Sequence, residues 1–184
     1  KLTLQQGDTT AALSALLNHF RNAGKDHWLV KNSHADPETH MQKEAEALLN
    51  NTVTFSGVTA KVPRSKTGGW DWTFTGPKGD QEFGYSLNGH QYLATLLTAW
   101  KETGDDIYVK TFDAIIRDWI IHNPVPAKGD TIYNVLKGLV NKLDYRDIGE
   151  VRWRTLEAGN RLGVSWPYAF LSFQQSEAFT PAAK

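Results

Sequence analysis

Apolar residues recur every three to four positions along most of this chain, the spacing that one buried face of an amphipathic helix requires. In the first such stretch the stripe includes Leu16, Leu17 and Phe20, while Asp8 or Thr9 can cap the start and Gly24 can end the helix. The same pattern predicts helices over residues 9–23, 37–49, 87–103, 106–122, 131–143, 151–163 and 166–173. Short turns separate most of them, so antiparallel helix pairs are expected.

The helical pattern breaks between residues 51 and 85. Runs of β-type residues at 52–55 and 58–62 indicate two short strands. Trp70 and Trp72 flank Asp71, so both indoles would face one side of an extended segment. Two interpretations stay open: a wall that stacks on sugar rings, or two tryptophans that seal the edge of the helical core. The aromatic residues favour an ordered segment in either case.

The start of the predicted 87–103 helix is a candidate anion site. Asn88 is placed to cap this helix, with His90 and Gln91 in its first turn. A helix N-terminus offers free N–H groups and a positive partial charge, which suit an anionic group. The alternative is a capping cluster with a solvent-facing histidine.

The segment from Trp153 to Arg161 carries further candidates. On a helix, Arg154, Glu157 and Arg161 share one face, and Trp153 lies on the neighbouring face. Glu157 and Arg161 are spaced for an i,i+4 ion pair, which leaves Arg154 as a planar fork for a carboxylate or a sulfate. The alternative is an exposed ion pair that stabilises the helix by ~0.3–0.5 kcal/mol.

Composition limits the partners of such a site. The 184 residues suggest a single domain, and 20 basic against 20 acidic residues give a net charge of zero. General attraction to nucleic acid or to an anionic membrane is therefore not supported. No apolar run approaches the ~20 residues that span a bilayer, and no signal peptide is visible. Any anion site must be built locally.

The chain contains no cysteine, which excludes disulfides, thiol catalysis and cysteine-ligated metals. His34 and His40, with Asp36 and Glu38 between them, invite a metal interpretation. Their spacing fits no compact motif, and Pro37 breaks a shared helical face. A loop followed by a helix cap is favoured, so no metal and no cofactor are assigned to this chain.

Three motifs stand in order over residues 40–175. They are Trp70-Asp71-Trp72 followed by Leu87-Asn88-Gly89-His90-Gln91, then Thr103-Gly104-Asp105-Asp106-Ile107-Tyr108, and last Trp153-Arg154-x-x-Glu157-x-x-x-Arg161. Together they resemble the N-terminal domain of the heparinase II/III polysaccharide lyases. The resemblance implies an all-α fold, an incomplete (α/α) toroid of antiparallel helix pairs with a short irregular or β insertion near residues 51–85. The helix ends of such a toroid form a groove for a polysaccharide.

The resemblance also implies an activity, β-eliminative cleavage of uronate-containing, glycosaminoglycan-like chains. Elimination needs a group that neutralises the C5 carboxylate, a base for the C5 proton and an acid for the departing O4. In the resembled family these roles fall largely to Asn, Tyr and His residues that follow the Trp-Arg…Glu…Arg motif. The catalytic residues are therefore expected beyond residue 184. Residues 1–184 would then be the N-terminal part of a longer multidomain lyase, and whether they are active alone stays open.

Within this chain the resemblance implies substrate-binding residues, namely Trp70, Trp72, Asn88, His90, Gln91, Trp153, Arg154, Glu157 and Arg161. The implied partners are an acidic polysaccharide and the remaining domains of the same lyase, and the implied location is periplasmic or secreted. Which uronate polymer is bound stays open, as does a metal in another domain.

Three rival functions remain. The first is a non-catalytic helical module that binds acidic carbohydrate. The second is a helical hydrolase, which needs two carboxylates in one cleft and for which Asp71 and Glu157 are the pair to nominate. The third is a purely structural helical domain.

Overall fold

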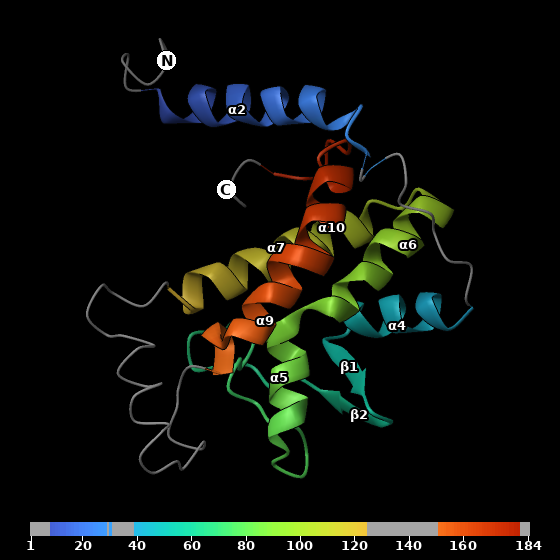
Figure 1. The fold of residues 1–184 in the computed structure, drawn as a ribbon, viewed down its shortest axis with the longest axis vertical. Coiled ribbons are helices and arrows are strands. Elements are labelled where there is room, and N and C mark those ends of the chain that lie inside the picture. Colours follow the sequence, from blue (N-terminus) through green and yellow to red (C-terminus); the bar gives the residue numbers. More distant parts are fainter. Residues whose placement is uncertain (1–7, 29, 31–38, 125–150, 181–184) are drawn as a thin grey trace.

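The computed structural model describes residues 8–28, 30, 39–124 and 151–180, and helices dominate it (Figure 1). In chain order its elements are α2 (Thr9–Gly24), α4 (Thr39–Leu49), β1 (Thr52–Phe55), β2 (Val58–Lys61), α5 (Gln81–Gly89), the 3-10 turn η1 (Gln91–Leu93), α6 (Ala94–Thr103), α7 (Ile107–His122), the 3-10 turn η3 (Val151–Trp153), α9 (Thr155–Asn160), the π-helical turn η4 (Arg161–Ser165) and α10 (Trp166–Phe173). The predicted helices at 9–23, 106–122 and 166–173 are confirmed. The helix predicted at 131–143 lies outside the described residues.

The core forms where α6 packs against α4, α7 and α10. Apolar stripes on α6, α7 and α10 supply it: Leu96, Phe112 and Phe173 are fully buried. In the first predicted stripe only Leu17 is buried, whereas Leu16 and Phe20 are 42% and 40% exposed. The rings of Phe112 and Phe173 lie 4.8 Å apart between their centroids, which joins α7 to α10. Burial of these stripes is the main stabilising contribution to this arrangement.

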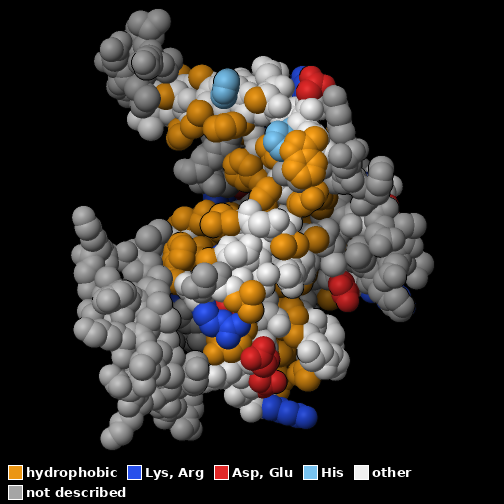
Figure 2. Space-filling view, in the orientation of Figure 1, with side chains coloured by type: hydrophobic (Ala, Val, Ile, Leu, Met, Phe, Trp, Pro, Cys, Tyr) orange, Lys and Arg blue, Asp and Glu red, His pale blue; other side chains and the backbone are white. Residues whose placement is uncertain are grey.

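Helix α2 lies across the end of α10 (Figure 1). Arg21 on α2 donates from Nε to the carbonyl of Gln174 at 2.6 Å and from Nη2 to the carbonyl of Ser176 at 2.9 Å. It also pairs with Glu177 at 3.1 Å. These bonds satisfy carbonyls of the turn after α10, so α2 is tied to the last described segment. Figure 2 shows apolar side chains on the surface along α2 and over the helices below it.

The interruption near residues 51–85 is a hairpin followed by a loop. β1 pairs with β2 antiparallel, with Thr52 opposite Lys61 and Phe55 opposite Val58. Ser56 and Gly57 both have positive φ, 50° and 77°, which is what a two-residue hairpin turn requires. The predicted strands are therefore confirmed.

The helix predicted over 87–103 is wrong as a single element. α5 ends at Gly89, His90 takes a left-handed conformation with φ 60° and ψ 13°, and the chain restarts as η1 and α6. Asn88 therefore lies in the last turn of α5 and is no N-cap. Asp80 caps α5 instead, accepting from the N–H of Glu82 at 3.0 Å. The proposed anion site at a helix N-terminus is lost with the break, which periodicity alone does not reveal.

The loop after the hairpin passes very close to α7 at Gly69. A Cβ added there would overlap Oδ1 of Asp118 and lie 2.7 Å from Cε1 of His122. Only glycine fits this approach without moving the Asp118 carboxylate, which is held by other bonds described below.

We expect Gly69→Ala to lower the free energy of unfolding by about 1–3 kcal/mol, because the new methyl group must displace a hydrogen-bonded side chain. Gly159→Ala is the matched control, since nothing lies within 4 Å of a Cβ built there. Alanine in α9 should be neutral or stabilise by up to about 1 kcal/mol. Urea unfolding of both variants measures the difference, and equal stabilities would contradict the close approach.

Candidate functional site

The Trp153–Arg161 segment is not the continuous helix predicted over 151–163. Arg154 is extended, with φ −54° and ψ 139°, between η3 and α9. The chain then widens into the π-helical turn η4 before α10. Pro167 has no N–H, so the α-helical bond from residue 167 to residue 163 cannot form. Such π turns often mark functional sites. Here the turn carries a buried Arg161 and an exposed Leu162 and Val164.

The ion pair in this segment joins Arg154 to Glu157. Nε of Arg154 donates to one carboxylate oxygen at 2.6 Å and Nη2 donates to the other at 2.9 Å. Because Arg154 precedes the helix, its side chain folds back over the first turn. The guanidinium also lies 3.7 Å above the ring of Tyr85. The predicted pairing of Glu157 with Arg161, which left the Arg154 fork free, is therefore corrected: Glu157 orients Arg154.

The two arginines differ in exposure. Arg154 keeps 39% of its side-chain surface exposed, while Glu157 keeps 3%. Burial works against the charge on Arg154, but the hydrogen bonds and the negative charge of Glu157 outweigh it and raise the Arg154 pKa. Arg161 is buried, and burial lowers its pKa to about 10, with Glu157 opposing the shift. Both side chains are therefore cationic at neutral pH.

Arg161 finds its partners on other elements. One guanidinium nitrogen donates to the backbone carbonyl of Asn88, and another donates to the carbonyl of Arg152 at 2.7 Å. The charge also lies 4.2 Å from the ring centroid of Trp119. Carbonyl oxygens and an aromatic face thus replace the water that the cation loses on burial.

Asn88 is fully buried and uses both ends of its amide. Nδ2 donates to the carbonyls of Trp72 and Gly84 at 3.0 and 2.9 Å, and Oδ1 accepts from the indole N–H of Trp119 at 3.1 Å. One side chain therefore joins the loop after the hairpin, α5 and α7.

His90 is fully buried in a cage of aromatic rings. Its Nδ1 accepts from the indole N–H of Trp166 at 3.0 Å, and the two rings stack at 5.7 Å. The rings of Trp72 and Trp119 each lie 5.4 Å from the imidazole. Burial, and then the positive charge of Arg161, lower the pKa of His90 well below 6.5. The imidazole is therefore neutral at neutral pH.

Trp70 and Trp72 stack on one another at 5.2 Å, and each is only 3% exposed. The indole of Trp72 and the backbone N–H of Trp70 both donate to Oδ2 of Asp118 at 2.9 Å. The indole of Trp70 donates to Asn51 at 2.9 Å. The sequence left two interpretations open, and the structure agrees with the one in which the two tryptophans seal the core.

The predicted binding residues thus fall into two groups. A buried network contains Trp70, Trp72, Asn88, His90, Glu157 and Arg161. Gln91 is exposed, and Trp153 and Arg154 are partly exposed. Direct contact of these last three with a substrate stays a prediction. The nominated pair of the hydrolase interpretation is engaged elsewhere, with Asp71 accepting from Thr73 and Glu157 from Arg154.

Sequence reasoning missed three members of this network. Trp119 and Trp166 lie in helices that were predicted from apolar spacing alone, yet their indole N–H groups bond Asn88 and His90. Asp118 was not singled out, although it accepts from two N–H groups. The unusual number of tryptophans, seven, was the available signal, because a buried indole N–H requires an acceptor.

Two further observations concern ligands and membranes. Among the residues that the structure describes, no three His, Asp or Glu side chains gather as a metal site. Residues 34–38 of the candidate metal segment lie outside that part of the chain.

No described helix combines the length and the apolarity needed to cross a membrane.

We expect Asn88→Ala to lower the free energy of unfolding by about 2–4 kcal/mol, because the Trp119 N–H loses its acceptor inside the core. Ser86→Ala, at an exposed position of the same helix, should change it by less than about 0.5 kcal/mol. Chemical denaturation followed by tryptophan fluorescence measures both. If Asn88→Ala changed the free energy of unfolding as little as Ser86→Ala does, the hydrogen bonds of the Asn88 side chain would not stabilise the fold.

The lowered pKa of His90 predicts a loss of stability in acid. Below pH 6.5 the unfolded chain binds a proton at this position that the folded chain does not, so stability is complete above that pH and falls below it. The contribution is at most about 1.4 kcal/mol per pH unit. Asn tolerates the left-handed backbone, so His90→Asn removes the titration while keeping the turn. Urea unfolding at several pH values should show a shallower slope for the variant, and parallel slopes would refute the assignment.

Comparison with known proteins places this chain in a family. The Heparinase II/III N-terminus family matches residues 1–183. A heparin-sulfate lyase of Bacteroides stercoris is 29% identical over 192 aligned residues, which cover 96% of this chain and 26% of that protein. A heparin-sulfate lyase of Bacteroides thetaiotaomicron is 27% identical over 62 residues, covering 34% of this chain and 9% of that protein.

Solved structures agree on the fold. The heparan sulfate lyase HepC of Pedobacter heparinus superposes with a TM-score of 0.72 at 22% identity, over 98% of this chain and 26% of that one. A heparinase III superposes with a TM-score of 0.68 at 24% identity, over 99% of this chain and 27% of that one. The chain therefore spans about a quarter of the B. stercoris lyase and of each solved structure. The expected incomplete (α/α) toroid is confirmed, and the chain belongs to the heparinase II/III family, as its N-terminal domain.

Proposed function

We propose that this chain is the N-terminal part of a lyase that cleaves uronate-containing polysaccharides of the heparan sulfate class by β-elimination, and that it supplies part of the substrate groove. The observation that carries the proposal is the family match over residues 1–183, supported by the alignment of 96% of the chain with a heparin-sulfate lyase. A periplasmic or secreted location fits such a substrate.

Burial of the titratable groups favours a binding role over proton transfer. Nε2 of His90 and the hydroxyl of Tyr92 are both buried, and no group of the described residues bonds either atom. Burial lowers the pKa of His90 well below and raises the pKa of Tyr92 well above the ordinary value. Neither group is placed to take the C5 proton or to protonate O4 of a bound sugar. We therefore assign the base and the acid to parts of the lyase beyond residue 184.

The groove edge that we assign to this chain carries Gln91, Trp153 and Arg154. Glu157 holds the Arg154 guanidinium in one orientation, while 39% of the Arg154 side chain stays exposed. Arg154 is therefore a preoriented positive charge for a sulfate or carboxylate. In the same segment of the chain, Leu156, Leu162 and Val164 are 60%, 66% and 51% exposed. Exposed apolar side chains of this kind suit packing by the remaining domains of the lyase.

The test is the affinity of the chain for heparan sulfate, measured by calorimetry with neutral dextran as the control polysaccharide. Arg154→Ala alone would leave Glu157 as a buried unpaired charge. The variant of choice is therefore Arg154→Gln with Glu157→Gln, which removes the ion pair as a unit. We expect it to raise the dissociation constant roughly five- to tenfold, the value of one charge-assisted contact.

Arg117 with Asp113 provides a matched control. It is the same kind of pair, with an arginine side chain 38% exposed and an acid 2% exposed, on α7. Arg117→Gln with Asp113→Asn should leave the affinity unchanged. If both double variants bound heparan sulfate with equal affinity, the assignment of Arg154 to the groove would be wrong. A folded wild-type chain without affinity for any uronate polymer would contradict the binding role itself.

A further inference from the structure

We propose that a pocket between the loop after the hairpin and α7 is a second, separate binding site for an acidic oligosaccharide, with Arg64 and Lys110 as its two charge contacts. The inference rests on the proposed function for the identity of its ligand. None of the residues assigned to the groove edge lines this pocket.

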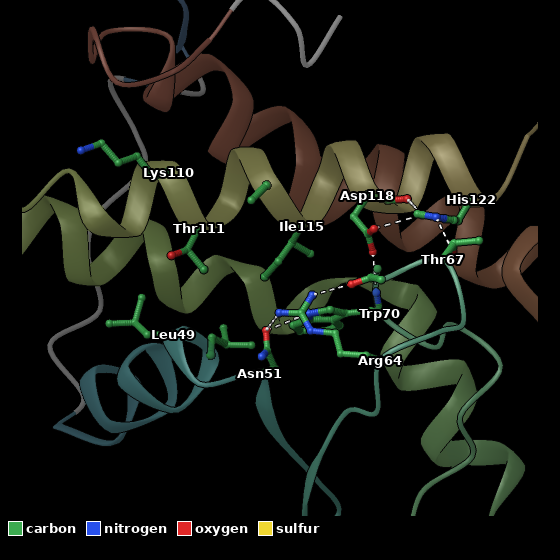
Figure 3. A pocket seen from close by; sticks show the side chains of 14 residues that line it. Leu49, Asn51, Arg64, Thr67, Trp70, Lys110, Thr111, Ile115, Asp118 and His122 are labelled. Atoms are coloured by element: carbon green, nitrogen blue, oxygen red, sulfur yellow. Dashed lines mark hydrogen bonds and ion pairs between the residues drawn. The ribbon is translucent and has the colours of Figure 1, made fainter.

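The pocket has a volume of about 520 Å³ and is open to solvent (Figure 3). It is lined by the end of α4, by Arg64 and residues 67–70 of the loop and by one side of α7. This volume falls within the range of about 300–1,000 Å³ that small-molecule sites occupy. Leu49, Ala114 and Ile115 give it apolar walls, against which the C–H faces of a sugar ring can lie.

The charges around the pocket favour an anion. Arg64 and Lys110 are both exposed and lie at different ends of it (Figure 3). Arg64 donates only to neutral oxygens, the Asn51 amide at 3.2 Å and the Gly68 carbonyl at 3.4 Å. Among the described residues, no carboxylate pairs with either cation. Arg21, Arg117 and Arg154, in contrast, are each paired with a carboxylate.

Asp118, the one acidic residue among the described residues that line the pocket, is already occupied. Its Oδ2 accepts from the backbone N–H of Trp70 and from the indole of Trp72, both at 2.9 Å. Its Oδ1 lies 3.0 Å from Nδ1 of His122. Three nitrogens therefore surround this carboxylate and hold its oxygens against the wall, so the pocket presents two cations and one carboxylate that is already hydrogen-bonded.

The polar wall is held rigidly. Nε2 of His122 bonds the hydroxyl of Thr67 at 2.9 Å, and that hydroxyl also bonds Ser65 at 2.8 Å. Gly69 permits the loop to approach α7 closely enough for these bonds. A preorganised wall with two uncompensated cations can bind a ligand without the entropic cost of ordering the loop. An oligosaccharide with anionic groups on several of its sugars is the ligand that we propose to span the two cations.

The test titrates a sulfated heparin tetrasaccharide into the chain and follows the indole N–H signals by NMR. The indole of Trp70 is the reporter for the pocket, because it donates to Asn51 Oδ1, which also accepts from Arg64. A ligand on Arg64 should shift this signal. The indole of Trp153 is the reporter for the groove edge. A fully desulfated tetrasaccharide, which keeps its carboxylates, shows which anionic group the pocket prefers.

The variants are Arg64→Gln and Lys110→Gln, with Lys61→Gln as the control that removes the same charge from an exposed site outside the pocket. Thermal unfolding checks that all three are folded. We expect each pocket variant to raise the dissociation constant for the Trp70 shift roughly three- to tenfold and the control to leave it unchanged.

The outcomes separate the two proposals. A Trp153 shift without a Trp70 shift, with pocket variants that bind like the control, would overturn the pocket and leave the proposed function standing. A Trp70 shift that only the pocket variants weaken supports the pocket, even if Arg154→Gln with Glu157→Gln has no effect. A folded wild-type chain that binds neither tetrasaccharide overturns both.

Discussion

The burial of the Arg161 guanidinium is the constraint around which this structure is arranged. Removing a cation from water costs several kcal/mol, on the order of the net stability of a domain, unless other groups replace the water. Here one replacement is the carbonyl of Asn88, in the last turn of α5. That turn has carbonyls without helical partners and carries negative partial charge. Arg161 therefore caps a helix that lies 73 positions earlier in the sequence.

The left-handed turn at His90 follows from the same arrangement. α5 must stop where its carbonyl is needed, and the chain leaves it through φ 60° at a residue that is not glycine. Such a conformation costs about 1–2 kcal/mol and requires compensation. The indole bond from Trp166 and the surrounding rings hold the imidazole in place. Arg161 in turn helps to keep that imidazole neutral.

The sequence revealed the helical class, the hairpin and the motif residues, because apolar periodicity and local turn chemistry are local signals. It did not reveal that Asn88 lies in the last turn of one helix instead of at the start of the next, or that Glu157 pairs with Arg154. Both depend on where the helix stops, and that is decided by partners far along the chain. Trp70 and Trp72 show the same limit: alternation placed both indoles on one side, but only the positions of Asn51 and Asp118 make that side the interior.

Trp72 connects the buried network to the pocket at α7. Its carbonyl accepts from Asn88 in the network, and its indole donates to Asp118 in the pocket wall. In a chain with no net charge, a cation that no carboxylate pairs with gives an acidic polymer a stronger local attraction than a paired one. Asp118 is the acidic residue of the pocket wall, among the residues that the structure describes. Its carboxylate is directed toward two N–H groups and an imidazole, so its oxygens are held within the wall, and Arg64 and Lys110 are the two cations that a ligand meets.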